Sequence, residues 1–181
     1  GFEPVQLKLT RTVRYSRPLF HFLKGLKSDA LVELKAGLVQ RGPLPDGPDV
    51  VLCEADRSTV AIEAERILFL WFNQGWCRPE QVLVLSRHGR MHRSALDGCN
   101  ELAGKPLVNH LERRSGEIGM LSVNRAKGLD ALAVILVDYA PWVALREDDH
   151  IGFFMGASRA RLLLAVIQTT GMTEGTADES Q

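Results

Sequence analysis

Short runs of hydrophobic residues alternate along the chain with longer segments in which hydrophobic residues recur every three or four positions. Several of the short runs are continuous, as in strands that are buried on both faces of a parallel sheet, whereas a strand with one face in water would alternate with polar residues. The pattern predicts strands at residues 5–9, 50–53, 81–85, 107–110, 118–123, 133–137 and 162–167.

Helical periodicity is clearest at residues 58–74, where hydrophobic side chains three and four positions apart share one face. Further helices are predicted at residues 17–40, with a possible break at Gly25, at residues 91–102 and at residues 148–160. Strands that alternate with helices in this way predict an α/β fold of three layers, in which helices cover both faces of a mostly parallel central sheet.

The length and composition are those of one globular domain. The chain has 181 residues, of which 45% are hydrophobic and 24% are charged, and this is enough for one sizeable core. Residues 1–168 are expected to form that domain, whereas residues 169–181 are small, polar and acidic and predict a flexible tail. The chain starts with Gly1 rather than Met, so we expect it to be a piece of a longer protein.

Positive and negative charges balance, because the 22 Lys and Arg residues equal the 22 Asp and Glu residues in number. Bulk charge therefore does not favour nucleic acid, and any contact with DNA must be local.

The cysteines Cys53, Cys77 and Cys99 are far apart and lack metal-ligand spacing, which predicts buried thiols in a reducing compartment. No stretch reaches the roughly 18 apolar residues of a membrane span. We therefore expect a cytoplasmic protein without a membrane partner.

The first candidate functional segment, residues 121–139, reads LSVNRAKGLDALAVILVDY. It predicts a buried strand, a short polar turn and a second buried strand. A junction with one glycine and a few charges occurs in any parallel α/β protein and needs no ligand, although ligands often bind at such strand ends. Through its core A-K-G-L at residues 126–129, however, the segment resembles motif V of UvrD/Rep-type superfamily 1 DNA helicases, commonly T-x-H-x-x-K-G-L-E.

The resemblance to motif V implies specific contacts. Lys127, Gly128 and Asp130 are then nucleotide-binding residues, and Asp130 stands in the position of the glutamate that binds the ribose. Ser122 replaces the usual threonine and keeps a hydroxyl for a DNA phosphate. Asn124 replaces the usual histidine and is a second candidate DNA contact.

The second candidate segment, residues 148–167, reads DDHIGFFMGASRARLLLAVI and brings Arg159 to the C-terminal end of a predicted helix, before a strand. A basic residue there interacts favourably with the helix dipole without any ligand. The segment also resembles motif VI of the same helicases, usually Y-V-A-x-T-R-A-K. This resemblance implies that Arg159 reaches the γ-phosphate of ATP, where a planar, permanently charged guanidinium stabilises the charge of the transferred phosphoryl group.

The third candidate segment, residues 9–26, contains Arg11, Arg14 and Arg17 between a predicted strand and a predicted helix. Such a basic cluster is most often a solvated face. The segment resembles motif IV, typically L-x-x-N-Y-R-S, and the resemblance implies that Arg14 is a second phosphate-sensing arginine. Val13 stands where the motif has the tyrosine that stacks on adenine, which implies weaker stacking on the base.

A fourth, weaker correspondence follows the strand predicted at residues 81–85 and makes Arg87 a candidate contact to the DNA backbone. Together the four segments follow the order of the family over residues 5–168. The resemblance implies a RecA-like fold of the P-loop NTPase type and the C-terminal half of an ATP-dependent DNA helicase or translocase. It further implies two partners, single-stranded DNA and the N-terminal RecA-like domain of the same protein, and an accessory domain that is reduced or absent.

The sequence contains no G-x-x-x-x-G-K-[ST] loop to hold the phosphates of ATP, and no apolar strand that ends in paired acids. The resemblance therefore implies that ATP and Mg²⁺ are bound in the full-length protein by the N-terminal domain. This chain alone is expected to bind neither and to hydrolyse no ATP. Arg14 and Arg159 then complete the ATP site from the other side of a cleft between the two domains.

Two other interpretations stay open. In one, the chain is a RecA-like domain that has lost catalysis and serves as a protein- or DNA-binding module, which the departures from the motifs at Val13, Asn124 and Asp130 favour. In the other, it is an unrelated nucleotide-binding α/β enzyme, but the sequence has no nucleophile with a base, no metal cluster and no glycine-rich phosphate loop. Retention of two arginines expected to face one cleft favours the motor over the binding module.

Overall fold

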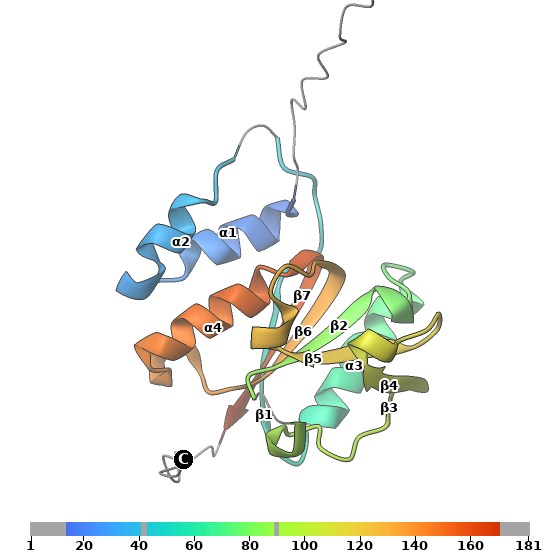
Figure 1. Ribbon diagram of the computed structural model, residues 1–181. Coiled ribbons are helices and arrows are strands. Elements are labelled where there is room, and N and C mark those ends of the chain that lie inside the picture. Colours follow the sequence, from blue (N-terminus) through green and yellow to red (C-terminus); the bar gives the residue numbers. More distant parts are fainter. Residues whose placement is uncertain (1–13, 41–42, 89–90, 171–181) are drawn as a thin grey trace, which may run out of the picture.

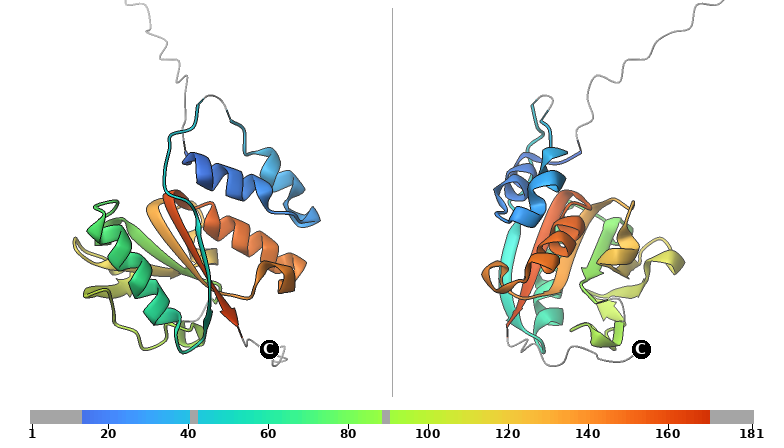
Figure 2. Two further views of the ribbon diagram at one scale, coloured as in Figure 1. Left: turned by 180° about the vertical axis from the view of Figure 1, so that it is seen from behind. Right: turned by 60° about the vertical axis from the view of Figure 1, so that its left-hand side comes forward.

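The computed structural model describes residues 14–40, 43–88 and 91–170 and has the three layers expected from the hydrophobic pattern. The α-helices are α1 (Arg17–Gly25), α2 (Val32–Ala36), α3 (Val60–Asn73) and α4 (Glu147–Ala157). Helix α3 covers one face of a sheet, and α1, α2 and α4 lie on the other (Figure 1 and Figure 2). The 3₁₀ turns are η1 (Asp29–Leu31), η2 (Pro79–Gln81), η3 (Met91–Arg93), η4 (His110–Glu112), η5 (Val123–Ala126) and η6 (Trp142–Ala144).

The strands are β1 (Val51–Asp56), β2 (Val82–Ser86), β3 (Glu101–Leu102), β4 (Lys105–Asn109), β5 (Ile118–Ser122), β6 (Ala131–Tyr139) and β7 (Ala160–Thr170). Within the described residues they form a seven-stranded sheet in the order β1-β7-β6-β2-β5-β4-β3. Neighbouring strands are parallel, except that β3 and β4 are antiparallel. The predicted α/β fold class is confirmed, because helices cover both faces of a mostly parallel sheet, which is consistent with a RecA-like domain.

Strand β2 shows why the hydrophobic runs are continuous. Leu83 and Leu85 pack into the hydrophobic cluster that includes residues of α1 and α4, whereas Val82 and Val84 pack into the cluster that includes α3. Successive side chains of a strand point to opposite faces of the sheet. A strand in the middle of this sheet therefore needs hydrophobic residues at every position, and all five residues of β2 are buried.

Each strand predicted within the described residues is confirmed, and the strand predicted at residues 5–9 lies outside them. The helix predicted at residues 58–74 is α3, and the break expected at Gly25 is present because α1 ends there. The helix predicted at residues 148–160 is α4, but the predicted end is wrong. Helix α4 ends at Ala157 because the chain already enters β7 at residue 160.

The helix predicted at residues 91–102 is wrong. These residues form the turn η3, an irregular loop and the short strand β3. Gly98 has a φ of 74°, which a right-handed helix does not permit. The loop is also held by a distant strand, because the hydroxyl of Ser94 and the backbone N–H of Ala95 both donate to the carboxylate of Asp138. A tertiary contact thus overrides the local helical periodicity.

The three cysteines are free thiols. Cys77 is buried, as predicted, whereas the prediction of burial is wrong for Cys53 and Cys99, which are only partly buried. Burial raises the pKa of Cys77 to about 11. This thiol is therefore almost entirely protonated at neutral pH and a poor nucleophile.

Helix α4 packs so closely on the sheet that Gly156 has no room for a side chain. A Cβ at this position would lie 2.7 Å from Cδ1 of Leu136 and 3.0 Å from Cγ2 of Val123, and both neighbours are buried. We expect Gly156→Ala to lower the free energy of unfolding by about 1 to 3 kcal/mol, because overpacking outweighs the gain in helix propensity. Urea unfolding followed by circular dichroism measures the effect.

Gly25→Ala is the matched control, since a Cβ at this other helical glycine would meet nothing within 4 Å. It is expected to be neutral or stabilising, because alanine is the better helix former. Equal destabilisation by the two substitutions would contradict the packing argument.

Candidate functional site

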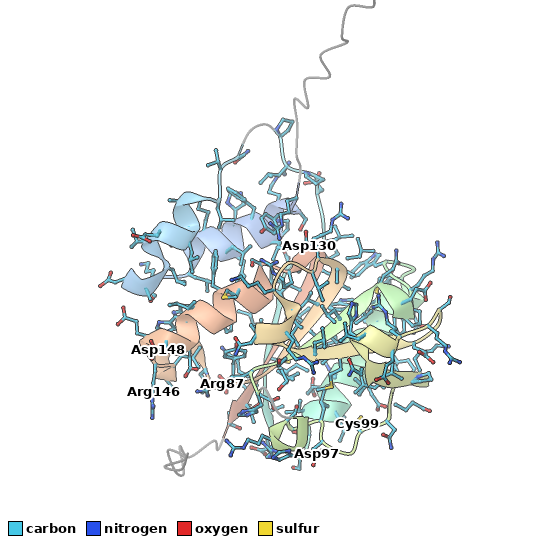
Figure 3. All side chains as sticks on the ribbon, viewed as in Figure 1. Arg87, Asp97, Cys99, Asp130, Arg146 and Asp148 are labelled. Carbon is cyan, nitrogen blue, oxygen red and sulfur yellow. The ribbon has the colours of Figure 1, made fainter. Side chains whose placement is uncertain are left out.

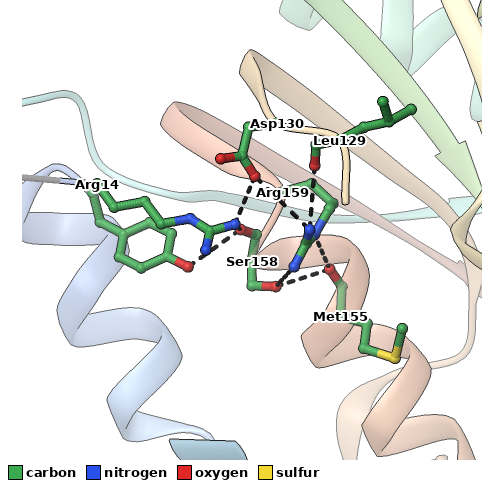
Figure 4. A network of polar contacts seen from close by, with 7 residues as sticks. Arg14, Leu129, Asp130, Met155, Ser158 and Arg159 are labelled. Carbon is green, nitrogen blue, oxygen red and sulfur yellow. Dashed lines mark hydrogen bonds and ion pairs between the residues drawn. The ribbon is translucent and has the colours of Figure 1, made fainter. Parts of the chain in front are cut away.

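Three of the predicted site residues meet at the edge of the sheet where β6 and β7 begin (Figure 4). Arg14 precedes α1, Asp130 precedes β6, and Arg159 lies between α4 and β7. The Arg14 guanidinium donates to Oδ1 of Asp130 at 2.6 Å, and Nη1 of Arg159 lies 3.8 Å from the same oxygen. These three residues form the arginine cluster, which holds two positive charges and one negative charge at the amino-terminal ends of two parallel strands.

The turn before Asp130 explains the glycine of the A-K-G-L sequence. The N–H of Leu129 donates to the carbonyl of Ala126 at 3.0 Å, Lys127 has φ −58° and ψ 123°, and Gly128 has φ 87°. These are the angles of a type II turn, whose third position favours glycine. Gly128 thus shapes the chain, Lys127 is exposed on the turn, and the turn delivers Asp130 to the arginine cluster.

Arg159 is held in place by neighbouring acceptors. Its Nε donates to the carbonyl of Met155 at 3.1 Å, its Nη1 to the carbonyl of Leu129 at 3.3 Å, and its Nη2 to Oγ of Ser158 at 3.2 Å. A guanidinium has five N–H donors, and the three used here leave two without an acceptor among the described residues. Arg159 is therefore a fixed, 19% exposed cation with donors left for an anion.

Arg14 is more exposed, at 42% of its side chain, and its guanidinium carbon lies 5.3 Å from the centre of the Tyr15 ring, within the range of a cation–π contact. Tyr15 itself is buried and donates its hydroxyl to the carbonyl of Ser158 at 3.3 Å. Burial raises the pKa of Tyr15, so the hydroxyl keeps its proton. Tyr15 thus ties the segment before α1 to the end of α4. Val13, where the motif has its stacking tyrosine, lies outside the described residues.

The predicted DNA-binding residues lie at the opposite edge of the sheet, where the parallel strands end. Ser122 is the last residue of β5, Asn124 follows in η5, and Arg87 follows β2. Figure 3 shows Arg87 and Asp130 far apart, toward opposite ends of the sheet. Ser122 is 2% exposed and its hydroxyl has no hydrogen-bond partner in the described part of the chain, while Asn124 is exposed. The length of a strand therefore separates the predicted nucleotide-binding and DNA-binding residues.

Arg87 is paired within the domain. Its Nη2 donates to Oδ2 of Asp149 at 2.7 Å, and the two side chains are 31% and 17% exposed. Asp149 lies in the first turn of α4, where the helix dipole favours a negative charge. The pair links β2 to α4, so Arg87 has to exchange the Asp149 carboxylate for a phosphate in order to bind DNA through its guanidinium.

A buried polar network lies where β2 and β6 end, and it was not predicted from the sequence. Asp138 is fully buried, and its carboxylate accepts from Ser86 Oγ at 2.6 Å, Ser94 Oγ at 2.6 Å and the Ala95 N–H at 2.7 Å. It has φ 67°, a conformation in which Asp is enriched. Burial, partly offset by this carboxylate, lowers the pKa of His88. The sequence signal for the network is one acid at the end of the apolar run in β6.

No group of three His, Cys, Asp or Glu side chains in the described residues is arranged to hold a metal ion. The same residues include no helix that is long and apolar enough to cross a membrane. The polar groups at the predicted positions are two guanidinium groups and a carboxylate where β6 and β7 begin, and a hydroxyl, an amide and a guanidinium group where the parallel strands end.

No protein-family model matches the chain, and no curated protein does. Among solved structures, the chain is similar to the crystal structure of the C-terminal domain of a possible DNA helicase from Lactobacillus plantarum WCFS1, with a TM-score of 0.61 over 90% of this chain and 91% of that chain. The two sequences are 13% identical. The likeness therefore establishes the fold, which is that of the C-terminal domain of a possible DNA helicase.

Proposed function

We propose that this chain is the C-terminal RecA-like motor half of a UvrD/Rep-type superfamily 1 DNA helicase or translocase. The arginine cluster carries the proposal, because three segments that each resemble a different helicase motif bring Arg14, Asp130 and Arg159 to one edge of the sheet. The motif resemblances depend on sequence alone, whereas the cluster depends on tertiary structure. Their agreement, together with the fold shared with the C-terminal domain of a possible DNA helicase, supports a motor.

At the amino-terminal edge, Arg14 and Arg159 face ATP that is held, with Mg²⁺, by the N-terminal RecA-like domain of the same protein. Arg159 presents its two remaining donors to phosphate oxygens at little entropic cost, because its other contacts already fix the side chain. Arg14 exchanges the Asp130 carboxylate for phosphate, which frees Asp130 to accept from the ribose. Lys127 adds positive charge on the adjoining turn, whose shape depends on Gly128.

At the carboxyl-terminal edge, Asn124 and Arg87 form part of the path of single-stranded DNA, and Ser122 joins it only when its buried hydroxyl becomes accessible. The chain has no net charge, so its contacts with DNA are local rather than those of a broad basic surface. Hydroxyl, amide and guanidinium groups are the donors that bind phosphates without regard to sequence. A path built from them suits a motor that moves along DNA of any sequence.

Helix α4 connects the two edges. Asp149, the partner of Arg87, lies in its first turn, and Arg159 lies just beyond its last residue. When Arg159 engages phosphate as the cleft closes, a small displacement of α4 changes the distance between Asp149 and Arg87. A packed helix that contacts both sites is the kind of element through which one site biases the other. ATP binding and release can then alternate the grip on DNA.

One observation favours the alternative, a RecA-like domain that acts as a non-catalytic protein- or DNA-binding module. The arginines assigned to ligands all have partners inside the domain: Arg14 with Asp130, Arg87 with Asp149, and Arg159 with the end of α4. In this alternative the arginines stabilise the fold and ATP has no role. The two proposals therefore differ in whether removal of an arginine affects catalysis beyond its effect on stability.

ATP hydrolysis by the longer protein that carries this chain, measured with and without single-stranded DNA, tests the motor proposal. We expect DNA-stimulated hydrolysis in the wild type, and a kcat about 100-fold lower in Arg14→Ala, which removes one donor aimed at the phosphates. The KM for ATP is expected to change little, because the N-terminal domain supplies most of the ground-state binding.

Arg66→Ala is the matched control, since Arg66 is 62% exposed on α3 and pairs with Glu63 on the other face of the sheet. It should leave kcat unchanged. Absence of DNA-stimulated hydrolysis, or equal activity of Arg14→Ala and the wild type, would refute the motor proposal and leave the binding module as the better account.

A further inference from the structure

A pocket of about 200 Å³ lies beside the carboxyl ends of β4 and β5. Its apolar lining comes from Leu96, Leu107, Met120 and Leu121, all of which are buried. One side of the pocket is the loop between η3 and β3, on which Figure 3 labels Asp97 and Cys99. Carboxyl ends of parallel strands are where α/β sheets bind ligands, so the position favours a binding role.

Polar groups accompany these apolar walls. Asn109 ends β4, and its side-chain oxygen accepts from the N–H of Leu111 at 3.1 Å, which leaves the amide NH₂ as the donor. Ser122 also lines the pocket, and its buried hydroxyl has no partner in the part of the chain that the structure describes. The side chains of Asp97 and Arg125 are exposed and make no hydrogen bond or ion pair with the described residues. The rim therefore offers the Asn109 amide, the Asp97 carboxylate and the Arg125 guanidinium, whereas the Ser122 hydroxyl lies below the surface of the pocket.

We propose that this pocket binds one nucleobase of single-stranded nucleic acid, turned out of the strand. A base is a flat ring with donors and acceptors along its edge, and it is bound between apolar side chains while polar groups contact that edge. The Asn109 amide and the Asp97 carboxylate supply one donor group and one acceptor group. The thioether of Met120 suits the face of an aromatic ring.

The charges at the rim orient the bound nucleotide. Arg125 attracts a phosphate, whereas Asp97 repels one, so the sugar–phosphate backbone passes over Arg125 and the base points toward Asp97. Arg125 lies in η5 next to Asn124, and Ser122 precedes the same turn. The inference thus rests on the proposed function, since it places a base beside residues that the DNA path already uses.

The size of the pocket favours a single base. Pockets that enclose a drug-sized ligand have volumes of about 300 to 1,000 Å³, which is larger than the roughly 200 Å³ found here. A free nucleoside carries the same ring as a base in a strand, and the lining alone does not distinguish them. The neighbouring Ser122, Asn124 and Arg87 favour a base that belongs to a strand.

Cys99 allows a direct test, because it lines the pocket and is partly buried. The rate of its alkylation by N-ethylmaleimide is measured by peptide-resolved mass spectrometry in the longer protein that carries this chain. Saturating concentrations of three probes are compared: a deoxyadenosine oligonucleotide, an abasic oligonucleotide of the same length, and free deoxyadenosine. Cys53 is the internal reference, because it lies on β1, at the opposite end of the strand order from β4 and β3. Cys77 should react slowly with every probe, because burial raises its pKa to about 11.

We expect the deoxyadenosine oligonucleotide to slow the alkylation of Cys99 several-fold and to leave Cys53 unchanged, whereas the abasic oligonucleotide protects neither thiol. The base pocket is overturned if the abasic oligonucleotide protects Cys99 as well as the deoxyadenosine oligonucleotide does, or if the deoxyadenosine oligonucleotide binds without protecting Cys99. Either result leaves the proposed function intact. Protection by free deoxyadenosine alone also overturns it, in favour of a free nucleoside. If neither oligonucleotide binds in a separate fluorescence-anisotropy titration, the DNA path of the proposed function fails together with the pocket.

Discussion

Replacement of Arg159 by alanine should lower kcat for ATP hydrolysis by about 1,000-fold or more in the longer protein that carries this chain, as expected for an arginine that stabilises the transferred phosphoryl group. This arginine is the more fixed of the two in the arginine cluster, because Met155, Leu129 and Ser158 provide its acceptors. A guanidinium that needs no reorganisation stabilises the transition state more than the ground state. The KM for ATP is therefore expected to change little.

Arg159→Lys separates charge from geometry. Lysine keeps the positive charge but lacks the planar fork that reaches three acceptors at once, so we expect it to recover only a small part of kcat. Both substitutions also remove hydrogen bonds at the end of α4, and we expect Arg159→Ala to lower the free energy of unfolding by about 1 to 3 kcal/mol. Urea unfolding of each variant measures that cost separately from kcat.

The two measurements together decide between the motor and the binding module. A fall in kcat much larger than the fall in folded fraction, with a nucleotide analogue still bound, supports an arginine that acts on phosphate. A variant that is destabilised but hydrolyses ATP at the wild-type rate per folded molecule means that Arg159 serves only the junction of α4 and β7. In that case the proposed contact of Arg159 with the γ-phosphate of ATP fails.

The fold could be predicted to a large extent because a strand that is buried on both faces of the sheet has a continuous run of hydrophobic residues in the sequence. Strand β2 is hydrophobic at each of its buried positions until Ser86, and a run of this kind between helical segments is typical of a strand in the middle of a parallel sheet. The error at residues 91–102 has the opposite origin. Its conformation depends on Asp138, which is more than 30 residues away in sequence, and local periodicity contains no information about that contact.

The candidate site was predictable only in part. Resemblance to three motifs selected Arg14, Asp130 and Arg159, but periodicity and composition gave no reason to place them together. The ion pair between Arg14 and Asp130 joins residues 116 positions apart. The pairing of Arg87 with Asp149 was equally hidden, because acids at the start of a helix interact favourably with its dipole and do not by themselves indicate a distant arginine. These contacts depend on how the helices and strands pack together, and that packing cannot be inferred from the periodicity or composition of a single sequence.

Asp138→Ala is expected to lower the free energy of unfolding by about 4 kcal/mol or more, because three donors lose their acceptor and each unsatisfied buried group costs about 1 to 3 kcal/mol. The donors are the hydroxyls of Ser86 and Ser94 and the N–H of Ala95. Alanine is also unfavourable at φ 67°, where aspartate is tolerated. Such a loss is a large fraction of the total stability of a domain. Urea unfolding followed by tryptophan fluorescence measures it.

Asp138→Asn and Asp46→Ala define the controls. Asparagine tolerates the same backbone conformation and keeps one acceptor oxygen, so its cost should be clearly smaller than that of alanine. Asp46 is 85% exposed and pairs with Arg17, and its loss should change stability by less than about 0.5 kcal/mol. If Asp138→Ala were as mild as Asp46→Ala, the network would not anchor the loop that follows η3. The same loop lines the proposed base pocket, so weakening this anchor should also speed the alkylation of Cys99 in the absence of DNA.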